Sequence, residues 1–121
     1  MRFPEPDLAA LAAAEEIDIE TRAADGTVHR TIVWVMVHDD VVYLRSYKGR
    51  VGRWYREALA DPAIALVVDE CRLSARAEPV TDEASVEACS AGLRDKYARS
   101  QSLAAMLAPA VLPTTLRVVP A

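Results

Sequence analysis

A segment rich in cations and aromatic rings holds the residue types best suited to binding a charged ligand. The stretch RSYKGRVGRWYR, residues 45–56, contains five cations and three aromatic rings in a chain whose formal net charge is -4. Backbone N–H groups at the start of a helix, with Lys48, Arg50 and Arg53 close by, are suited to holding a phosphate. The alternative is structural: the cations form a solvated face and Trp54 packs the helix onto a sheet, which composition alone favours. The segment therefore predicts a local anion site, weighed against a purely structural role.

No other segment offers recognisable catalytic chemistry. His29 and His38 are nine positions apart, so one uninterrupted strand would place them on opposite faces, and we expect solvated strand-end histidines without a metal. Cys71 and Cys89 form neither a disulfide framework nor a zinc motif. The chain lacks G-x-S-x-G, G-x-x-x-x-G-K-S/T and G-x-G-x-x-G segments. Hydrolysis and nucleoside triphosphate binding are therefore not supported, and no catalytic residue is predicted.

Composition narrows the class of protein. The 121 residues suffice for one domain, so we expect a single domain spanning 1–121. Hydrophobic residues make up 52% of the chain and charged residues 26%, which is typical of a compact globular protein. The acidic pI of about 5.1 argues against a nucleic-acid partner or an anionic membrane. The sequence shows no signal-peptide pattern and no apolar run of about 18 residues, so we expect a cytoplasmic protein without a membrane partner.

Apolar periodicity and turn residues predict the elements that must position the basic segment. We expect a helix over 8–16 with Asp7 as its N-cap, and strands over 17–22, 28–37, 41–46, 63–69, 73–80 and 114–119. Turns are expected at Asp25-Gly26, 38–40 and 70–72. Further helices are expected from about 51 to 59, around 102–108, and after a cap at Thr81 or Asp82, the last with a buried stripe of Val86, Cys89, Leu93 and Tyr97. Tight turns between most strands indicate an α+β, mostly β fold: an antiparallel sheet curled into a small barrel.

The strand expected over 28–37 has two faces that both avoid water. One face carries Thr31, Val33, Val35 and Val37 and is expected to line the barrel core. The other carries Arg30, Ile32, Trp34 and Met36 and is too apolar for open solvent. Three kinds of cover fit this second face: a helix of the same chain, a partner subunit or a flat ligand. We give the helix the same weight as the other two together. We also expect a homodimer, because so small a barrel would otherwise expose Trp34 and Met36.

Several segments resemble one known group of proteins. Thr21 to Pro62, with R-T-I-V-W-V-M-V, V-Y-L-R-S, G-R-W-Y-R and A-D-P, resembles the split-barrel flavin- and deazaflavin-binding proteins related to pyridoxamine phosphate oxidase. The tail, with R-A-E-P-V-T-D, D-K-Y and T-T-L-R-V-V-P, looks like one small subfamily of unknown function in that group. The resemblance implies a six-stranded antiparallel split β-barrel with short flanking helices. It also implies a homodimer whose interface holds FMN or deazaflavin, and hydride transfer in the members that are enzymes.

The resemblance also transfers to single positions. Ser46, Lys48 and Gly49 match the strand-end segment that faces the cofactor in the deazaflavin nitroreductase-like branch, and Trp54-Tyr55 matches the start of its W-Y-x-N-L-x-A-N-P helix, with Ala60 and Pro62 further along. The asparagines of that motif are Glu57 and Asp61 here, and the G-R-K-S-G phosphate loop is replaced by residues 23–27. Asp25 in that loop would repel a phosphate, whereas Arg30 could supply a positive charge. The candidate cofactor-binding residues are Arg30, Trp34, Ser46, Lys48, Gly49, Arg50, Arg53, Trp54 and Tyr55.

Three functions are compatible with these features. The first is a flavin or deazaflavin oxidoreductase acting on a small organic substrate, in which the cofactor carries the chemistry. The second is a barrel that binds a cofactor or another anion without turnover, as a carrier or sensor. The third is a dimeric barrel without a ligand, since a fold alone does not fix a function.

Overall fold

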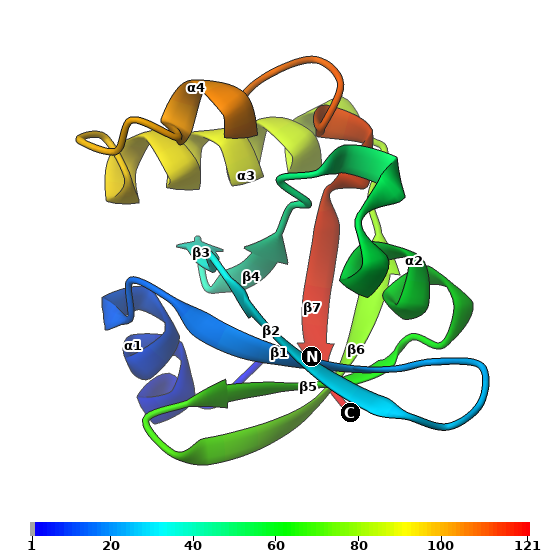
Figure 1. The fold of residues 1–121 in the computed structure, drawn as a ribbon. Coiled ribbons are helices and arrows are strands. Elements are labelled where there is room, and N and C mark those ends of the chain that lie inside the picture. The colour runs from blue at the N-terminus through cyan, green and yellow to red at the C-terminus, as the bar shows by residue number, and fades with distance from the viewer. Residues whose placement is uncertain (1) are drawn as a thin grey trace.

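A computed structural model describes residues 2–121 as one curled antiparallel sheet with helices around it (Figure 1). The sheet has seven strands in the order β2-β1-β5-β6-β7-β4-β3. Their bounds are β1 Ile17–Arg22, β2 Val28–Val33, β3 Met36–His38, β4 Val41–Leu44, β5 Ala63–Val68, β6 Cys71–Pro79 and β7 Leu116–Pro120. The α-helices are α1 Glu5–Ala13, α2 Arg53–Ala60, α3 Glu83–Lys96 and α4 Leu103–Met106, and two 3-10 turns are η1 Gly49–Val51 and η2 Leu112–Thr114.

The α+β, mostly β prediction is confirmed, but the prediction of six strands is wrong. The strand expected over 28–37 is two strands, β2 and β3, which lie at opposite edges of the sheet. The chain leaves one edge and joins the other through Trp34 and Val35. There the Val35 N–H donates to Tyr97 Oη at 3.3 Å and the Val35 carbonyl accepts from Lys96 Nζ at 2.8 Å. Because Lys96, the last residue of α3, and the following Tyr97 satisfy the Val35 backbone, this segment needs no strand neighbour.

Acidic residues with positive φ form two of the hairpin turns. Asp39 and Asp40 have φ of 49° and 63°, and Asp69 and Glu70 have φ of 49° and 65°. Two consecutive residues in this region form the tight turn whose twist suits antiparallel strands. The predicted turn at 38–40 is therefore confirmed. The second turn lies at 69–70 instead of 70–72, so β6 begins at Cys71, two residues earlier than expected.

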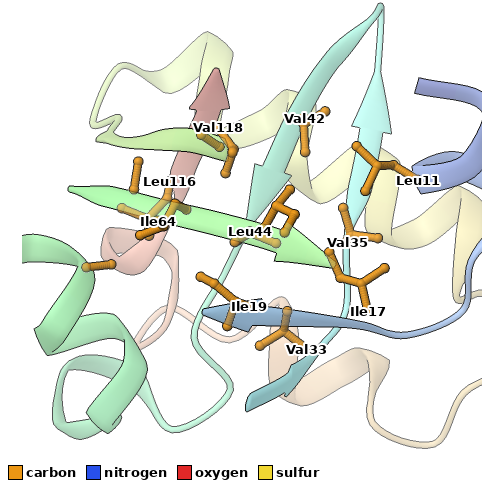
Figure 2. Close-up of a cluster of buried hydrophobic side chains, with 14 of the residues drawn as sticks. Leu11, Ile17, Ile19, Val33, Val35, Val42, Leu44, Ile64, Leu116 and Val118 are labelled. Atoms are coloured by element: carbon orange, nitrogen blue, oxygen red, sulfur yellow. The ribbon is translucent and has the colours of Figure 1, made fainter. Parts of the chain in front are cut away.

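The interior of the curled sheet is a cluster of aliphatic side chains (Figure 2). Residues of one face of β1, β4, β5, β6 and β7 point into it, and Figure 2 labels among others Ile19, Val35, Leu44, Ile64 and Leu116. Helix α1 adds Leu8 and Leu11, and α2 adds Trp54, Tyr55 and Ala58. These two helices therefore cover the parts of the interior cluster that the curled sheet leaves open.

Helix α1 begins earlier than the sequence indicates. Its first residue is Glu5, so Asp7 lies inside the first turn and does not cap the helix. Pro6 occupies that first turn, where its missing N–H removes no intrahelical hydrogen bond. The cap expected for α3 is confirmed at Asp82, whose carboxylate accepts from the Ser85 N–H at 2.9 Å.

Helices α3 and α4 cover the outer face of β3 and β4. A second apolar cluster forms there from Met36, Tyr43, Cys89, Leu93, Tyr97 and Met106. The outward face expected for residues 30–36 is thus only partly covered by the chain itself. Met36 is fully buried, whereas Ile32 is 66% exposed and Arg30 is also exposed. No helix among residues 2–121 combines the length and apolar content needed to cross a bilayer.

Candidate functional site

Two adjoining cavities lie against the uncovered part of β2. One has a volume of about 430 Å³, and its wall includes Trp34, Arg45 and Met106. The other, of about 450 Å³, is lined by Lys48 and Arg53 among others. Ile32, Tyr47 and Trp54 line both cavities, so we treat the two as one site and name it the β2 groove. Three aromatic side chains and two exposed cations therefore belong to a single concave surface.

The connection after β4 is built around Ser46. Two hydrogen bonds hold the fully buried Ser46 in position. Its N–H donates to Thr114 Oγ1 at 3.0 Å, and its Oγ donates to the Gly49 carbonyl at 2.7 Å. Gly49 has a φ of +69°, which favours glycine. A Cβ on Gly52 would lie 2.7 Å from Ser46 Oγ. This packing fixes the chain on both sides of Lys48, whose side chain remains exposed.

Trp34 is held flat by a second aromatic ring. The rings of Trp34 and Tyr97 are stacked with their centroids 3.9 Å apart and their planes 3° apart. Tyr97 Oη donates to the Glu15 carbonyl at 2.7 Å and accepts from the Val35 N–H. Burial raises the pKa of Tyr97 to about 12, so the phenol is neutral at physiological pH. Trp34 therefore forms a rigid part of the groove wall.

Lys96, at the end of α3, bonds to helix α1 and to the connection between β2 and β3. Its Nζ donates to the carbonyls of Leu11 and Val35 at 3.0 and 2.8 Å. It also lies 5.4 Å from the centroid of the Tyr97 ring. Burial lowers the pKa of Lys96 to about 8. Lys96 does not line either cavity of the β2 groove, so its part in the site is to hold the wall.

Arg45 is a buried groove residue that was not among the candidate residues. It is 2% exposed, directly follows the last residue of β4, and extends under α3 and α4. Its guanidinium donates four hydrogen bonds of 3.0 Å each, to Thr115 Oγ1, Ser90 Oγ and the carbonyls of Met106 and Val86. Strand alternation was the available signal, since Val42 and Leu44 facing inward send Arg45 to the outer face.

The structure brings five of the nine candidate residues to the groove: Trp34, Ser46, Lys48, Arg53 and Trp54. Gly49 supports the connection without lining it, and Tyr55 is buried in the interior cluster. Arg50 is exposed and lies outside both linings. Arg30 is paired with Glu20 at 2.7 Å, and Arg72 donates to the same carboxylate at 2.9 Å. Arg30 therefore belongs to a separate charge cluster.

His29 is more engaged than the sequence indicated. Its Nδ1 lies 3.0 Å from Glu57 Oε2, and Thr21 Oγ1 donates to Glu57 Oε1 at 2.7 Å. Burial alone would raise the pKa of Glu57, but the hydrogen bonds from Thr21 and His29 outweigh it and leave this pKa below its usual value. The expectation of a solvated strand-end histidine is wrong for His29, which helps to fasten α2 to the β1-β2 hairpin.

Comparisons with known proteins agree with this fold. A family profile described as "Uncharacterized protein conserved in bacteria" matches residues 7–118. No curated protein shows significant sequence similarity to the chain. The heme storage protein HutZ of Vibrio cholerae has a TM-score of 0.73 at 14% identity, covering 100% of this chain and 92% of that one.

Two further solved structures show the same likeness. A protein of Listeria innocua, provisionally described as a pyridoxamine 5'-phosphate oxidase, has a TM-score of 0.69 at 16% identity over 96% of this chain and 91% of that one. A conserved hypothetical protein of Mycobacterium tuberculosis has a TM-score of 0.72 at 14% identity over 96% and 78%. At such identities the likeness is one of fold.

Proposed function

Since this chain belongs to DUF2255, a family of uncharacterized proteins conserved in bacteria, and has a split-barrel fold, we propose that it binds a flavin-type cofactor, FMN or deazaflavin, in the β2 groove. The observation that carries the proposal is the joining of Trp34, Tyr47 and Trp54 with Lys48 and Arg53 in one concave surface. Aromatic side chains suit a planar ring system, and the cations suit its phosphate.

The two ends of the groove fit the two parts of such a cofactor. Trp34 offers a ring whose orientation is fixed by its stack on Tyr97. At the other end, Lys48 and Arg53 lie beside Gly52, where α2 begins, so backbone N–H groups add to the positive potential. The Arg53 guanidinium donates to Thr31 Oγ1 at 3.0 Å, which orients it along β2. The residues present therefore fit a planar molecule with an anionic tail.

Haem is the second candidate, because two of the similar structures are described as a heme storage protein and a heme binding protein. A haem site needs a side chain that binds iron, most often histidine or cysteine. Neither residue lines the β2 groove, and Tyr47 and Met106 are the side chains there of a kind found on haem iron. The groove is therefore better suited to a flavin-type ring than to haem.

Hydride transfer to a small organic substrate is the chemistry that a flavin-type cofactor supplies when bound. The chain's own part is to orient the ring against Trp34, neutralise phosphate charge at Lys48, and keep water from the ring through Ile32 and Trp54. Binding without turnover, as a carrier or sensor, is the alternative. Reduction of an acceptor by the loaded protein, with a nicotinamide or reduced deazaflavin as donor, distinguishes the two.

The binding proposal is tested by titrating the purified protein with FMN and, separately, with a deazaflavin, while the fluorescence of Trp34 and Trp54 is followed. We expect saturable quenching by one of them. Lys48→Ala should weaken that binding about five- to tenfold, since an exposed charge-assisted contact contributes roughly 1 to 1.5 kcal/mol. Haem is titrated in parallel, and tighter binding of haem would replace the flavin proposal.

Arg50→Ala is the matched control for this experiment. Arg50 is two residues away, exposed, and of the same charge, but it does not line the groove. We expect the Arg50→Ala variant to bind the cofactor as tightly as the unmodified protein does. An equal loss of cofactor affinity in Lys48→Ala and Arg50→Ala would mean that only net charge matters. If the unmodified protein binds neither FMN nor the deazaflavin, the proposal is wrong.

A further inference from the structure

Arg45 places a buried cation in the wall of the β2 groove without an ion-pair partner. None of the ion pairs formed within residues 2–121 includes it. Its four hydrogen-bond acceptors are two hydroxyls and two carbonyls, all neutral. A buried charge is stabilised far better by an opposite charge than by neutral acceptors alone. The structural role of Arg45 is thus fulfilled. Glu87 acts on its charge only through space, without an ion pair, and the exposed Glu16 lines the same cavity.

The guanidinium also has donor capacity left. An arginine carries five N–H groups, and the four hydrogen bonds use Nε, both hydrogens of Nη1 and one hydrogen of Nη2. One N–H on Nη2 is left without a protein acceptor. Arg45 is 2% exposed and is part of the lining of the 430 Å³ cavity. This N–H therefore belongs to a nearly dry cation at the edge of an open volume.

Arg45 and the cations at the other end of the groove serve different parts of it. Arg45 lines only the first cavity, and Lys48 and Arg53 line only the second. The exposed pair suits a phosphate, which keeps much of its hydration. A desolvated guanidinium with one free donor, beside the rings of Trp34 and Trp54, suits a singly charged group on a flat molecule.

We infer that Arg45 forms a binding site for the carboxylate of a small aromatic substrate, at the end of the β2 groove away from Lys48. The inference rests on the proposed function, because it assigns the substrate class for the site that would hold the cofactor. The free N–H of Nη2 donates to one carboxylate oxygen, and the substrate ring lies against the aromatic wall that includes Trp34.

The first test uses the unmodified protein without added cofactor, with benzoate and its neutral analogue benzamide as probes. Buried guanidinium N–H groups exchange slowly and give separate NMR signals, so the Arg45 signals can be followed directly. We expect benzoate to shift them saturably at up to about 10 mM, and to bind at least tenfold more tightly than benzamide, a difference of about 1.4 kcal/mol. Unchanged Arg45 signals, or equal binding of the two probes, would overturn the inference.

The second test uses Arg45→Gln, which keeps amide donors but removes the charge. We expect it to abolish the preference for benzoate over benzamide, while Lys48→Ala leaves that preference intact. A preference that survives in a folded Arg45→Gln protein contradicts the inference. If the variant does not fold, the NMR titration of the unmodified protein decides the question without it.

The outcomes separate this inference from the proposed function. FMN or deazaflavin binding without a benzoate effect leaves the cofactor proposal standing and removes the carboxylate site. A benzoate effect at Arg45 without binding of either cofactor leaves a carboxylate-binding groove and removes the cofactor proposal. Addition of benzoate to the loaded protein then shows whether the carboxylate and the cofactor occupy the groove together.

Discussion

The two cysteines differ sharply in their surroundings. Cys89 is fully buried between α3 and the outer face of the sheet, and Cys71 is exposed at the start of β6. Burial raises the pKa of the Cys89 thiol from 9.0 to about 11. Because the folded state holds the proton more tightly than the unfolded state, this group contributes stability that is complete below pH 9 and is lost as the pH rises toward 11.

We therefore expect Cys89→Ala to lose less stability between pH 9 and pH 11 than the unmodified protein. The difference should be on the order of 2 to 3 kcal/mol in the free energy of unfolding, measured by denaturant titration at each pH. Lys96 acts in the opposite direction over part of this range, since its lowered pKa favours the folded state as the pH rises above about 8. Comparison with the variant cancels that contribution. Cys71→Ala is the control, and a curve like that of Cys89→Ala would contradict the prediction.

At the scale of single residues, the sequence indicated the groove but not its deepest member. Lys48, Arg53 and Trp54 were found because cations and rings next to glycine mark a ligand-binding connection. Arg45 was missed as a separate residue because its hydrogen-bond acceptors come from Val86, Ser90, Met106 and Thr115, all at least 41 positions away. Strand alternation directs Arg45 to the outer face, but nothing near it in the sequence shows that α3 and α4 bury it there.

The connection between β4 and α2 is the element on which the groove depends. Gly52 has φ of -59° and ψ of 131°, a conformation open to any residue, yet a Cβ there would meet the buried Ser46 Oγ. Gly26, in the β1-β2 turn, shows the reverse: its φ is +91°, but a Cβ would meet nothing within 4 Å. A substitution at Gly52 therefore tests steric crowding, whereas one at Gly26 tests backbone strain.

Gly52→Ala should lower the free energy of unfolding by about 1 to 3 kcal/mol, because overpacking forces Ser46 or the connection to move. It should also weaken cofactor binding, since Lys48 and Arg53 flank the displaced segment. Gly26→Ala should cost about 1 kcal/mol through backbone strain alone and leave binding unchanged. Denaturant titrations and the fluorescence assay measure both effects. Unaltered binding in Gly52→Ala would show that the connection is not what positions the cations.

At the scale of elements, local patterns predicted most strands but not the break at Trp34 and Val35. Alternation and the Asp25-Gly26 turn indicated the β1-β2 hairpin, and its register pairs Ile17 with Val33. The break depends on Lys96 and Tyr97, which lie 61 and 62 positions from Val35. A local apolar pattern carries no information about hydrogen bonds formed across such a distance.

The molecule as a whole exposes apolar side chains at one edge of its sheet. Ile32 is 66% exposed and Val28 is 51% exposed on the edge strand β2, and Tyr47 beside the groove is 59% exposed. An edge strand with such side chains is prone to association. We therefore propose a homodimer that uses this surface, in which the partner would cover the groove.

Light scattering of the purified protein should give twice the 13.2 kDa mass of the chain. Ile32→Glu should shift the equilibrium to monomer, because it places a charge in the apolar contact. Leu59→Glu is the matched control, since Leu59 is 46% exposed on α2 and lines neither cavity of the groove. A mass of 13.2 kDa for the unmodified protein at working concentration contradicts the dimer.

The connection between the two edge strands limits how far the curled sheet can open. Its two edge strands, β2 and β3, are joined by the chain itself, through Trp34 and Val35. The three peptide units from Val33 to Met36 span at most about 11 Å when fully extended. These two strand ends therefore stay within that tether length however far the edges separate elsewhere. Opening of the barrel must pivot about this point, so a ring bound against Trp34 would lie where the motion of the sheet is smallest.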